Sequence, residues 1–301
     1  MSRNIHLGDP PRSMPLLVQL STVLGGMGVQ IGSAFVAFGM IFVWVFGLQS
    51  EAVTFLVFRG PSTTVQGEVL RVQQTSSSEN DRDIFAVHYR YEADGSSLTG
   101  TSYTIDSPAT PGSTVPVEML IGNPKRSRVT GLRVRPFGAG GVVTGLFPLI
   151  GLVLGAVSVL QGVRACRLLR YGRVARAKII LREQTRMHVN EKPVVKFTFE
   201  FSIRASNKLF GYRESPEGEL RTVRFVHRTH ETLPLEDDAE EPILYDPERP
   251  ESAYPMDGLP SRIVVDDDGR LHPGSGVART LVLPAISLSV IAAGIAWLAL
   301  S

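Results

Sequence analysis

This sequence contains almost no cysteine and has a very small net charge. Cys166 is the only cysteine among 301 residues, which excludes an internal disulfide and a cluster of thiolate metal ligands. The 31 basic residues nearly balance 29 acidic ones, and the formal net charge of +2 argues against a dedicated nucleic-acid-binding protein. Met1 is followed by a polar tail without the basic, apolar and small-residue series of a cleavable signal peptide, so we expect the first apolar segment to be retained.

Ionisable side chains are missing from three long apolar segments, at 26–48, 139–163 and 280–300. A helix needs about 20 apolar residues to cross a hydrocarbon core of about 30 Å, and each segment is long enough. We therefore predict an α+β membrane protein in which three transmembrane helices are joined by two small antiparallel β domains. The lack of charge at membrane depth argues against ion-coupled carriers, proton relays and voltage sensors.

The predicted domains follow from these segments. The N-terminal tail at 1–25 contains apolar residues at helical spacing, which indicate either an interfacial helix or a water-side extension of the first span packed on the rest of the protein. Those residues are Leu16, Leu17, Leu20, Val23 and Leu24. The remaining domains are the first transmembrane helix at 26–48, a β domain at 49–137, the second helix at 138–163, a β domain with an Arg-rich start at 164–279, and the third helix at 280–300.

Glycine, proline and tryptophan residues add detail to the predicted helices. Gly28 and Gly32 are spaced to let another helix approach closely, and Pro148 is expected to kink the second helix. Trp44 and Trp297 lie near helix ends, where indole rings prefer the membrane interface. The second helix carries further glycines four residues apart, Gly141 with Gly145 and Gly151 with Gly155.

Basic residues on both sides of the second span set the expected orientation. The following side has Arg164, Arg167, Arg170, Arg173, Arg176 and Lys178, and the preceding side has Lys125, Arg126, Arg128, Arg133 and Arg135. Arg3, Arg12, Arg270 and Arg279 tip the count, so we place the N-terminus and 164–279 in the cytoplasm and 49–137 outside the cell (inner or plasma) membrane. One span between the β domains then puts them on opposite faces. The arginines from 164 to 176 recur every third residue, and we expect them to meet anionic lipid headgroups.

The two polar segments resemble copies of one unit of about four to six strands. Alternating apolar residues predict a strand with one buried face in each, Phe85, Val87, Tyr89 and Tyr91 in the first and Val195, Phe197, Phe199 and Phe201 in the second. We match 67–72 with 177–182 as a preceding strand and 98–100 with 209–211 as a following one. Asn123-Pro124 is matched with Asp246-Pro247 as a turn after a strand.

The loops of the second copy are expected to differ from those of the first. We predict an exposed acidic loop at 231–241, with 75–83 as its shorter counterpart in the first copy. A late strand at 263–265 precedes a turn at 266–269, and a flexible linker then leads into the third span.

Four features of the sequence together resemble those of a known family. They are an apolar helix, the Arg-rich stretch with Leu-Leu-Arg-Tyr-Gly at 168–172, the alternating V-x-Y-x-Y strand, and a strand ending in Asn-Pro or Asp-Pro followed by Ser. This pattern is similar to bacterial membrane proteins grouped as domain-of-unknown-function family 3592, in two tandem copies. The second copy departs from it by the acidic insertion and a longer gap between Pro247 and Gly258. The resemblance implies a membrane-anchored β module and carries no activity.

No motif predicts a catalytic, cofactor or metal site. His227 and His230, followed by Glu231, have metal-like spacing, but the local pattern indicates a strand that puts the two rings on opposite faces, so we interpret them as surface histidines. Asp266-Asp-Asp-Gly lacks the alternate acids of a calcium loop and is interpreted as a solvated turn. We therefore expect no enzyme activity and no cofactor.

Three functions remain for comparison. The first is a membrane-anchored binding or interaction module, for which we consider the lipid bilayer, an unidentified protein and a second copy of the chain, in a homo-oligomer, as partners. The alternative is an accessory subunit of a transporter or cell-envelope complex, assembled through Gly28, Gly32, Gly151 and Gly155. A membrane enzyme would require acids of the 231–241 loop to converge with His227 or His230.

Overall fold

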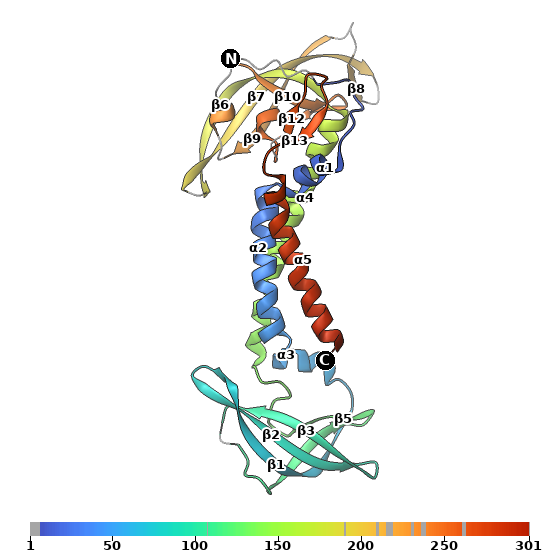
Figure 1. Cartoon of the computed structure of the whole chain (residues 1–301), viewed down its shortest axis with the longest axis vertical. Coiled ribbons are helices and arrows are strands. Elements are labelled where there is room, and N and C mark those ends of the chain that lie inside the picture. Colours follow the sequence, from blue (N-terminus) through green and yellow to red (C-terminus); the bar gives the residue numbers. More distant parts are fainter. Residues whose placement is uncertain are drawn as a thin grey trace. The chain divides into compact units, whose positions relative to one another are not determined.

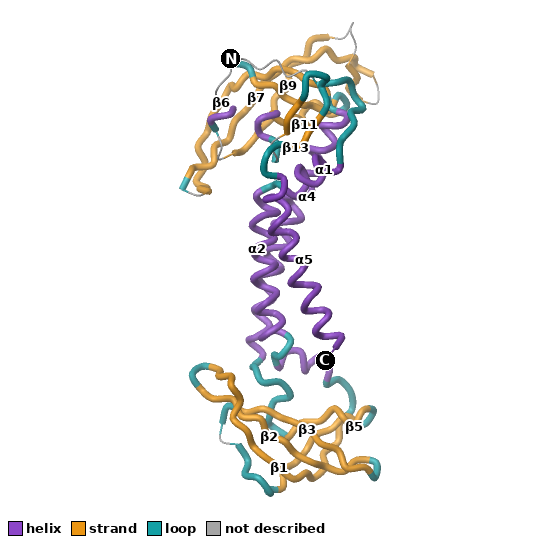
Figure 2. The backbone as a smooth tube through the Cα atoms, viewed as in Figure 1, coloured by secondary structure: helices purple, strands orange, loops and turns teal. Residues whose placement is uncertain are grey.

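The computed structural model describes residues 7–106, 108–189, 191–208, 211–214, 219–229, 232–235, 239–260 and 263–300. The chain forms two compact units, one from Met1–Ala34 and Gly151–Ser287 and one from Phe35–Ile150 and Leu288–Ser301. Both contain helices and antiparallel sheet (Figures 1 and 2), which confirms the α+β class. Helices long and apolar enough to cross a membrane occur at Met27–Gly47, Ala139–Tyr171 and Val277–Leu300, close to the predicted spans.

The first and third apolar segments follow their predictions with small changes. Helix α2 (Met27–Phe42) continues as a π-helical turn, η1 (Val43–Gly47). Helix α5 (Val277–Leu300) begins slightly before the predicted start and includes Pro284. Where α5 passes Trp44, Gly294 leaves room for the indole, because a Cβ on Gly294 would lie 1.9 Å from the ring.

The second apolar segment differs from its prediction at both ends. It begins as the 3-10 helix η2 (Ala139–Gly145) and becomes α-helical only in α4 (Leu146–Tyr171), which runs beyond the predicted end at 163. Pro148 occupies the first turn of α4, where its missing N–H costs no helical hydrogen bond. The expected kink inside the helix is therefore replaced by a change of helix type before Pro148.

Glycines of α2 pack directly on α4 within one unit. A Cβ on Gly32 would lie 2.5 Å from the carbonyl oxygen of Gly151 and 2.9 Å from the backbone nitrogen of Gly155. A Cβ on Gly28 would lie 2.8 Å from Cβ of Ser158. Gly28 and Gly32 thus provide the close helix approach that their spacing predicted, and they provide it inside the chain.

The first sheet is a partly closed five-stranded barrel, called here the first barrel. Its strands lie in the order β3-β2-β1-β4-β5, every neighbouring pair antiparallel. Ser102 of β3 and the β5 end close it, since the Val129 N–H donates to Ser102 Oγ at 2.9 Å. The bounds are β1 (Ser62–Glu79), β2 (Arg82–Ala93), β3 (Ser96–Thr104), β4 (Thr114–Leu120) and β5 (Asn123–Val129), with the short helix α3 (Glu51–Val57) before them.

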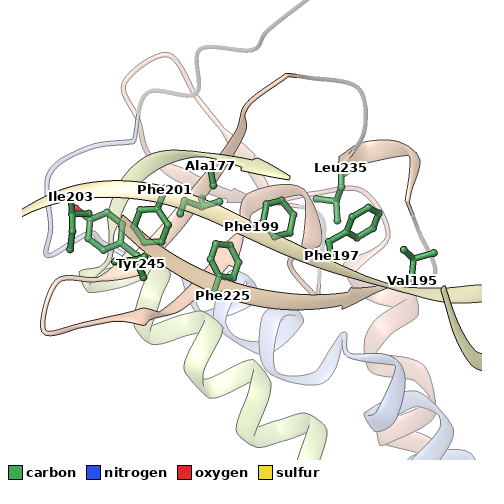
Figure 3. Packing of buried hydrophobic residues seen from close by; sticks show 11 residues of the cluster. Ala177, Val195, Phe197, Phe199, Phe201, Ile203, Phe225, Leu235 and Tyr245 are labelled. Carbon is green, nitrogen blue, oxygen red and sulfur yellow. The ribbon is translucent and has the colours of Figure 1, made fainter. Parts of the chain in front are cut away.

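The second sheet, called the second barrel, repeats this order as β11-β10-β6-β7, with β9 and the short β8 both paired to β7. Its core is aromatic: the Phe225 ring contacts those of Phe199 and Phe201, and the Tyr245 ring contacts that of Phe201 (Figure 3). The bounds are β6 (Arg173–Val189), β7 (Lys192–Lys208), β8 (Gly211–Glu214), β9 (Glu219–Thr229), β10 (Glu241–Asp246) and β11 (Arg249–Pro255), followed by the hairpin of β12 (Ile263–Val265) and β13 (Leu271–Pro273). Two 3-10 turns, η3 (Leu233–Leu235) and η4 (Met256–Gly258), flank β10 and β11.

Strand register confirms the internal repeat. Val69 pairs with Tyr89, and Ile179 pairs with Phe199, so both partners differ by 110 in residue number. The register shift after Val69 recurs after Ile179, again 110 residues later. Irregularities of the ladder are specific to a backbone path. Their recurrence at equivalent places shows that both barrels follow the same path through their first two strands.

Three predicted matches between the copies are wrong. The strand equivalent to β3 is β9, because Gly100 and Phe225 lie opposite Tyr89 and Phe199. Asn123-Pro124 opens β5 and corresponds to Arg249-Pro250 at the start of β11, whereas Asp246 ends β10. The 75–83 segment is the hairpin between β1 and β2 and has no counterpart in 231–241. Short Pro-containing turns look alike in sequence, and only pairing distinguishes them.

The 231–241 segment is also less exposed than predicted. Leu235 is fully buried in the aromatic core, and Glu241 at the start of β10 is 1% exposed. Residues 231 and 236–238 of this loop lie outside the described residues. A single apolar side chain among acids therefore anchors a loop that composition alone marks as solvated.

Helix α1 (Leu16–Leu24) packs on α4 through a different face from the predicted one. Its buried residues are Val18, Ser21 and Thr22, whereas Leu16 is 68% and Leu17 51% exposed. Small polar residues form the contact because α4 presents Gly162 there, where a Cβ would lie 2.6 Å from Cα of Val23.

Candidate functional site

The first barrel contains a small cavity of about 270 Å³, called the first-barrel cavity. It lies between α3, β3, the start of β5 and the segment that leads from the barrel to η2. Its lining residues are Thr54, Phe58, Gly100, Thr101, Lys125, Arg126, Ser127, Val134 and Arg135.

Hydroxyl groups line the inner part of this cavity. Ser127 is 8% exposed, and its Oγ lies 2.9 Å from the hydroxyl of Tyr89 in the core. Thr54 is 6% exposed and donates to a carboxylate oxygen of Glu51 at 3.1 Å. Thr101 Oγ1 lies 3.0 Å from Nδ1 of His88. Burial and the neighbouring charge of Arg71 lower the pKa of His88, which favours its neutral ring.

Cations form the outer part of the cavity. Lys125, Arg126 and Arg135 are exposed, and none of the lining residues is acidic. Lys125 and Arg135 have no acidic side chain within ion-pair distance in the part of the chain that the structure describes. Three cations without a carboxylate in the lining favour an anionic ligand.

The nearest acids are held by other groups. Glu51 accepts hydrogen bonds from the backbone N–H groups of Val134 and Arg135, at 3.0 and 3.1 Å. Glu118 accepts from Arg128 at 2.8 Å and from Ser62 at 2.9 Å. Partial burial raises the pKa of Glu118, but these hydrogen bonds outweigh it and leave the pKa below its ordinary value.

Arg128 connects the barrel to α3 and so fixes the cavity wall. Its guanidinium pairs with Glu118, lies 3.9 Å from Glu51, and sits 4.9 Å from the ring centroid of Phe58. Glu51 and Phe58 mark the two ends of α3. The cavity therefore depends on contacts between residues far apart in sequence.

The second barrel carries different residues at the equivalent positions. Strand register matches Ser127 with Ala253, because these residues lie opposite Met119 and Tyr245. By the same register Thr101 corresponds to Val226. The preceding positions of β5 and β11 match Lys125 with Glu251 and Arg126 with Ser252, and Gly100 corresponds to Phe225. The basic, hydroxyl-lined character is thus a property of the first barrel and not of the repeated fold.

A larger groove of about 590 Å³ lies at the end of α4 in the other unit. It carries mixed charge, since Arg167 lies 3.6 Å from Asp246, whose Oδ1 also accepts from the Glu248 N–H at 3.0 Å. Its other lining residues are Leu168, Tyr171, Gly172, Arg173 and Pro247. Internal pairing makes this groove a weaker candidate for an anion than the first-barrel cavity.

The predicted row of arginines is divided between two elements. Arg164, Arg167 and Arg170 are exposed on α4, but the helix ends at Tyr171, and Arg173 and Arg176 lie on β6. Successive odd and even positions of a strand point to opposite faces. The five arginines therefore do not share one side of a helix.

His227 is buried, which corrects its interpretation as a surface residue. It lies on β9 with 9% exposure, opposite Phe197, and its ring meets that of Tyr254 edge-on at 4.9 Å. Burial lowers its pKa to about 4. His230 and Glu231 lie outside the described residues. Within the described chain no three His, Cys, Asp or Glu side chains are grouped as metal ligands.

The Asp266 turn is confirmed as a hairpin turn between β12 and β13. Asp266 Oδ1 accepts from the Arg270 N–H at 2.7 Å, and Oδ2 lies 2.8 Å from Nε2 of His272. These two hydrogen bonds, that from Arg270 first, lower the pKa of Asp266. Both carboxylate oxygens thus serve the turn.

Neither protein-family models, nor curated proteins, nor solved structures show a match to this chain. Sequence reasoning used Lys125, Arg126 and Arg135 only as topology signals and missed the cavity that they line. Their excess over acids between 123 and 135 was the available signal.

Proposed function

We propose that this chain is a membrane-anchored binding module whose ligand site is the first-barrel cavity. The observation that carries the proposal is the basic lining of that cavity, in which no residue is acidic and in which Lys125 and Arg135 have no acidic partner among the described residues. One wall of the cavity is formed by α3, which directly follows the first apolar helix. A cavity with few convergent polar groups is the usual form of a ligand site.

Exposed apolar side chains on the helices support the anchor. Leu152, Val153 and Leu160 of α4 are 59%, 57% and 63% exposed, and Ile295 of α5 is 57% exposed. Contiguous apolar surface of this kind is stable in lipid and unfavourable in water. We infer three spans of the cell membrane, with the N-terminus and the second barrel cytoplasmic and the first barrel outside, as the basic residues predict.

The similarity to domain-of-unknown-function family 3592 belongs to this proposal. The repeated barrel agrees with the β module which that resemblance implies, but no activity comes with it. The accessory-subunit alternative loses one of its supports. The face of α2 that carries Gly28 and Gly32 packs on α4 of the same chain, so a partner would have to contact other faces of the helices.

A comparison of three forms of the full chain tests the binding function. The natural chain, a cavity variant (Lys125→Ala, Arg126→Ala and Arg135→Ala) and a matched second-barrel variant (Glu251→Ala and Ser252→Ala) would be purified from membranes in the same mild detergent. Native mass spectrometry should find a bound molecule on the natural chain and the matched variant and lose it on the cavity variant. Equal retention by all three forms, or no bound molecule on any of them, would overturn the proposal.

A further inference from the structure

We infer that the first-barrel cavity binds a phosphate monoester, with the terminal phosphate held between the outer cations and the inner hydroxyls. This inference rests on the proposed function, because it names the ligand of the same site. Arginine and lysine bind phosphate through charge-assisted hydrogen bonds, and hydroxyls supply further donors. Lys125, Arg126 and Arg135 provide the cations, and Thr101 and Ser127 provide the hydroxyls.

The dimensions of the cavity select a small group. About 270 Å³ lies below the usual range for drug-sized ligands and fits a phosphate with a short ester. Phe58 and Val134 add an apolar side to the lining, which suits the carbon part of such an ester. A carboxylate peptide side chain would use the cations but leave this apolar side without a partner.

Lys125 and Arg135 are not neutralised by an acidic side chain among the described residues. Glu51 is engaged by the Val134 and Arg135 N–H groups and by Thr54, and Glu118 is engaged by Arg128. Both carboxylates therefore hold the wall in place and do not line the cavity. The positive charge of Lys125 and Arg135 therefore remains in the lining, and a phosphate would balance it.

Within the unit that contains the first barrel, the cavity wall contacts the end of the first apolar helix and the start of the second. Ser50, which begins α3, donates to the Gly138 carbonyl at 2.8 Å just before η2, and the Phe46 and Phe137 rings meet at 5.0 Å. If the apolar helices span a bilayer, these ends lie at the level of the phospholipid phosphates. A lipid headgroup is then one source of the phosphate, and a soluble phosphate ester is the other.

The second barrel gives an internal comparison. Its equivalents of the lining cations and hydroxyls are Glu251, Ser252, Ala253 and Val226, which replace two cations by an acid and a small polar residue and both hydroxyls by apolar groups. Since the two barrels share their strand order, the fold does not require the basic lining. The difference is what a ligand site in one copy would produce.

The test measures binding of short-chain phosphatidic acid to the purified full chain in a neutral detergent, by native mass spectrometry and calorimetry. We expect binding at least tenfold stronger than that of short-chain phosphatidylcholine, and at least tenfold weaker binding after Lys125→Ala, Arg126→Ala and Arg135→Ala. Thr101→Val, which copies the second barrel without changing charge, should weaken binding several-fold. The matched Glu251→Ala and Ser252→Ala variant should bind as the natural chain does.

Competition by glycerol phosphate distinguishes the sources. Phosphatidic acid that glycerol phosphate displaces at millimolar concentration indicates a soluble ester, and phosphatidic acid that it does not displace indicates a lipid headgroup. The inference would be overturned if phosphatidylcholine bound as strongly as phosphatidic acid. It would also be overturned if phosphatidic acid bound equally well to the natural chain, the cavity variant and Thr101→Val. The inference would also be overturned if the molecule that the natural chain retains and the cavity variant loses contains no phosphate. The proposed binding function would stand in that case.

Discussion

Ser102 in the first barrel and His227 in the second occupy equivalent positions, opposite Val87 and Phe197. In the first barrel Ser102 accepts the Val129 N–H. The residue equivalent to Val129 is Pro255, which has no N–H to donate. A ring that packs on Tyr254 and lies beside Gly258 replaces the lost hydrogen bond, so His227 closes the second barrel by contact.

Acid should destabilise the second barrel through His227. Its pKa is about 4 in the folded chain and about 6.5 when unfolded, so between these values the unfolded chain binds the extra proton. Stability is complete above pH 6.5 and decreases as pH falls towards 4, by up to about 3 kcal/mol. As the pH decreases from 7.5 to 4.5, the thermal midpoint of the natural chain should fall relative to that of His227→Leu. Parallel curves would show that His227 does not titrate in this window.

Arg12 should stabilise the end of α4. It is 7% exposed and donates to the carbonyl oxygens of Leu169 and Gly172, at 3.0 and 2.8 Å. Burial lowers the pKa of Arg12, yet a guanidinium stays charged and suits a helix C-terminus. Arg12→Met should cost about 2 kcal/mol and speed hydrogen exchange near the end of α4. Arg164→Ala, on an exposed position of the same helix, is the control and should change little.

Glycine positions on the two packed helices should differ in tolerance. A Cβ at Gly32 meets backbone atoms of α4 at 2.5 and 2.9 Å, whereas a Cβ at Gly155 meets nothing within 4 Å. Gly32→Ala should destabilise the detergent-solubilised chain by about 1–3 kcal/mol, and Gly155→Ala should be neutral or slightly stabilising. The comparison uses thermal midpoints. Equal effects would mean that α2 and α4 do not pack through Gly32.

Sequence periodicity predicted the strands and helices well, because burial of one face imposes a period that single residues display. Val195, Phe197, Phe199 and Phe201 are all buried as predicted, and in the first copy Val87, Tyr89 and Tyr91 are buried while Phe85 is half-buried. Matching of loops failed where strand pairing decides equivalence. The cavity was not predictable, since Arg128 and Glu51 bring its walls together across a long stretch of sequence with no local pattern.

Tyr89 should contribute a hydrogen bond that its equivalent, Phe199, lacks. Burial raises the pKa of Tyr89, more than the hydrogen bonds from Ser127 and Ser102 lower it, so the hydroxyl stays protonated. Tyr89→Phe leaves the buried Ser127 without this partner and should cost about 1 kcal/mol. Phe199→Tyr should cost at least as much, because the residue equivalent to Ser127 in the second barrel is Ala253, which has no hydroxyl. Chemical denaturation of the full chain would compare the two, and a cost for Phe199→Tyr alone would refute the role of Tyr89.

The sidedness of the two barrels is the most direct measurement. In a Cys166→Ser background, single cysteines would replace Ser76 in the first barrel and Asp267 in the β12–β13 hairpin that follows the second barrel, both exposed. Intact cells and inverted membrane vesicles would be treated with a maleimide that does not cross membranes. Three spans predict that Ser76→Cys is labelled only in intact cells and Asp267→Cys only in inverted vesicles. Labelling of both cysteines from the same side would contradict a second apolar helix that crosses the membrane.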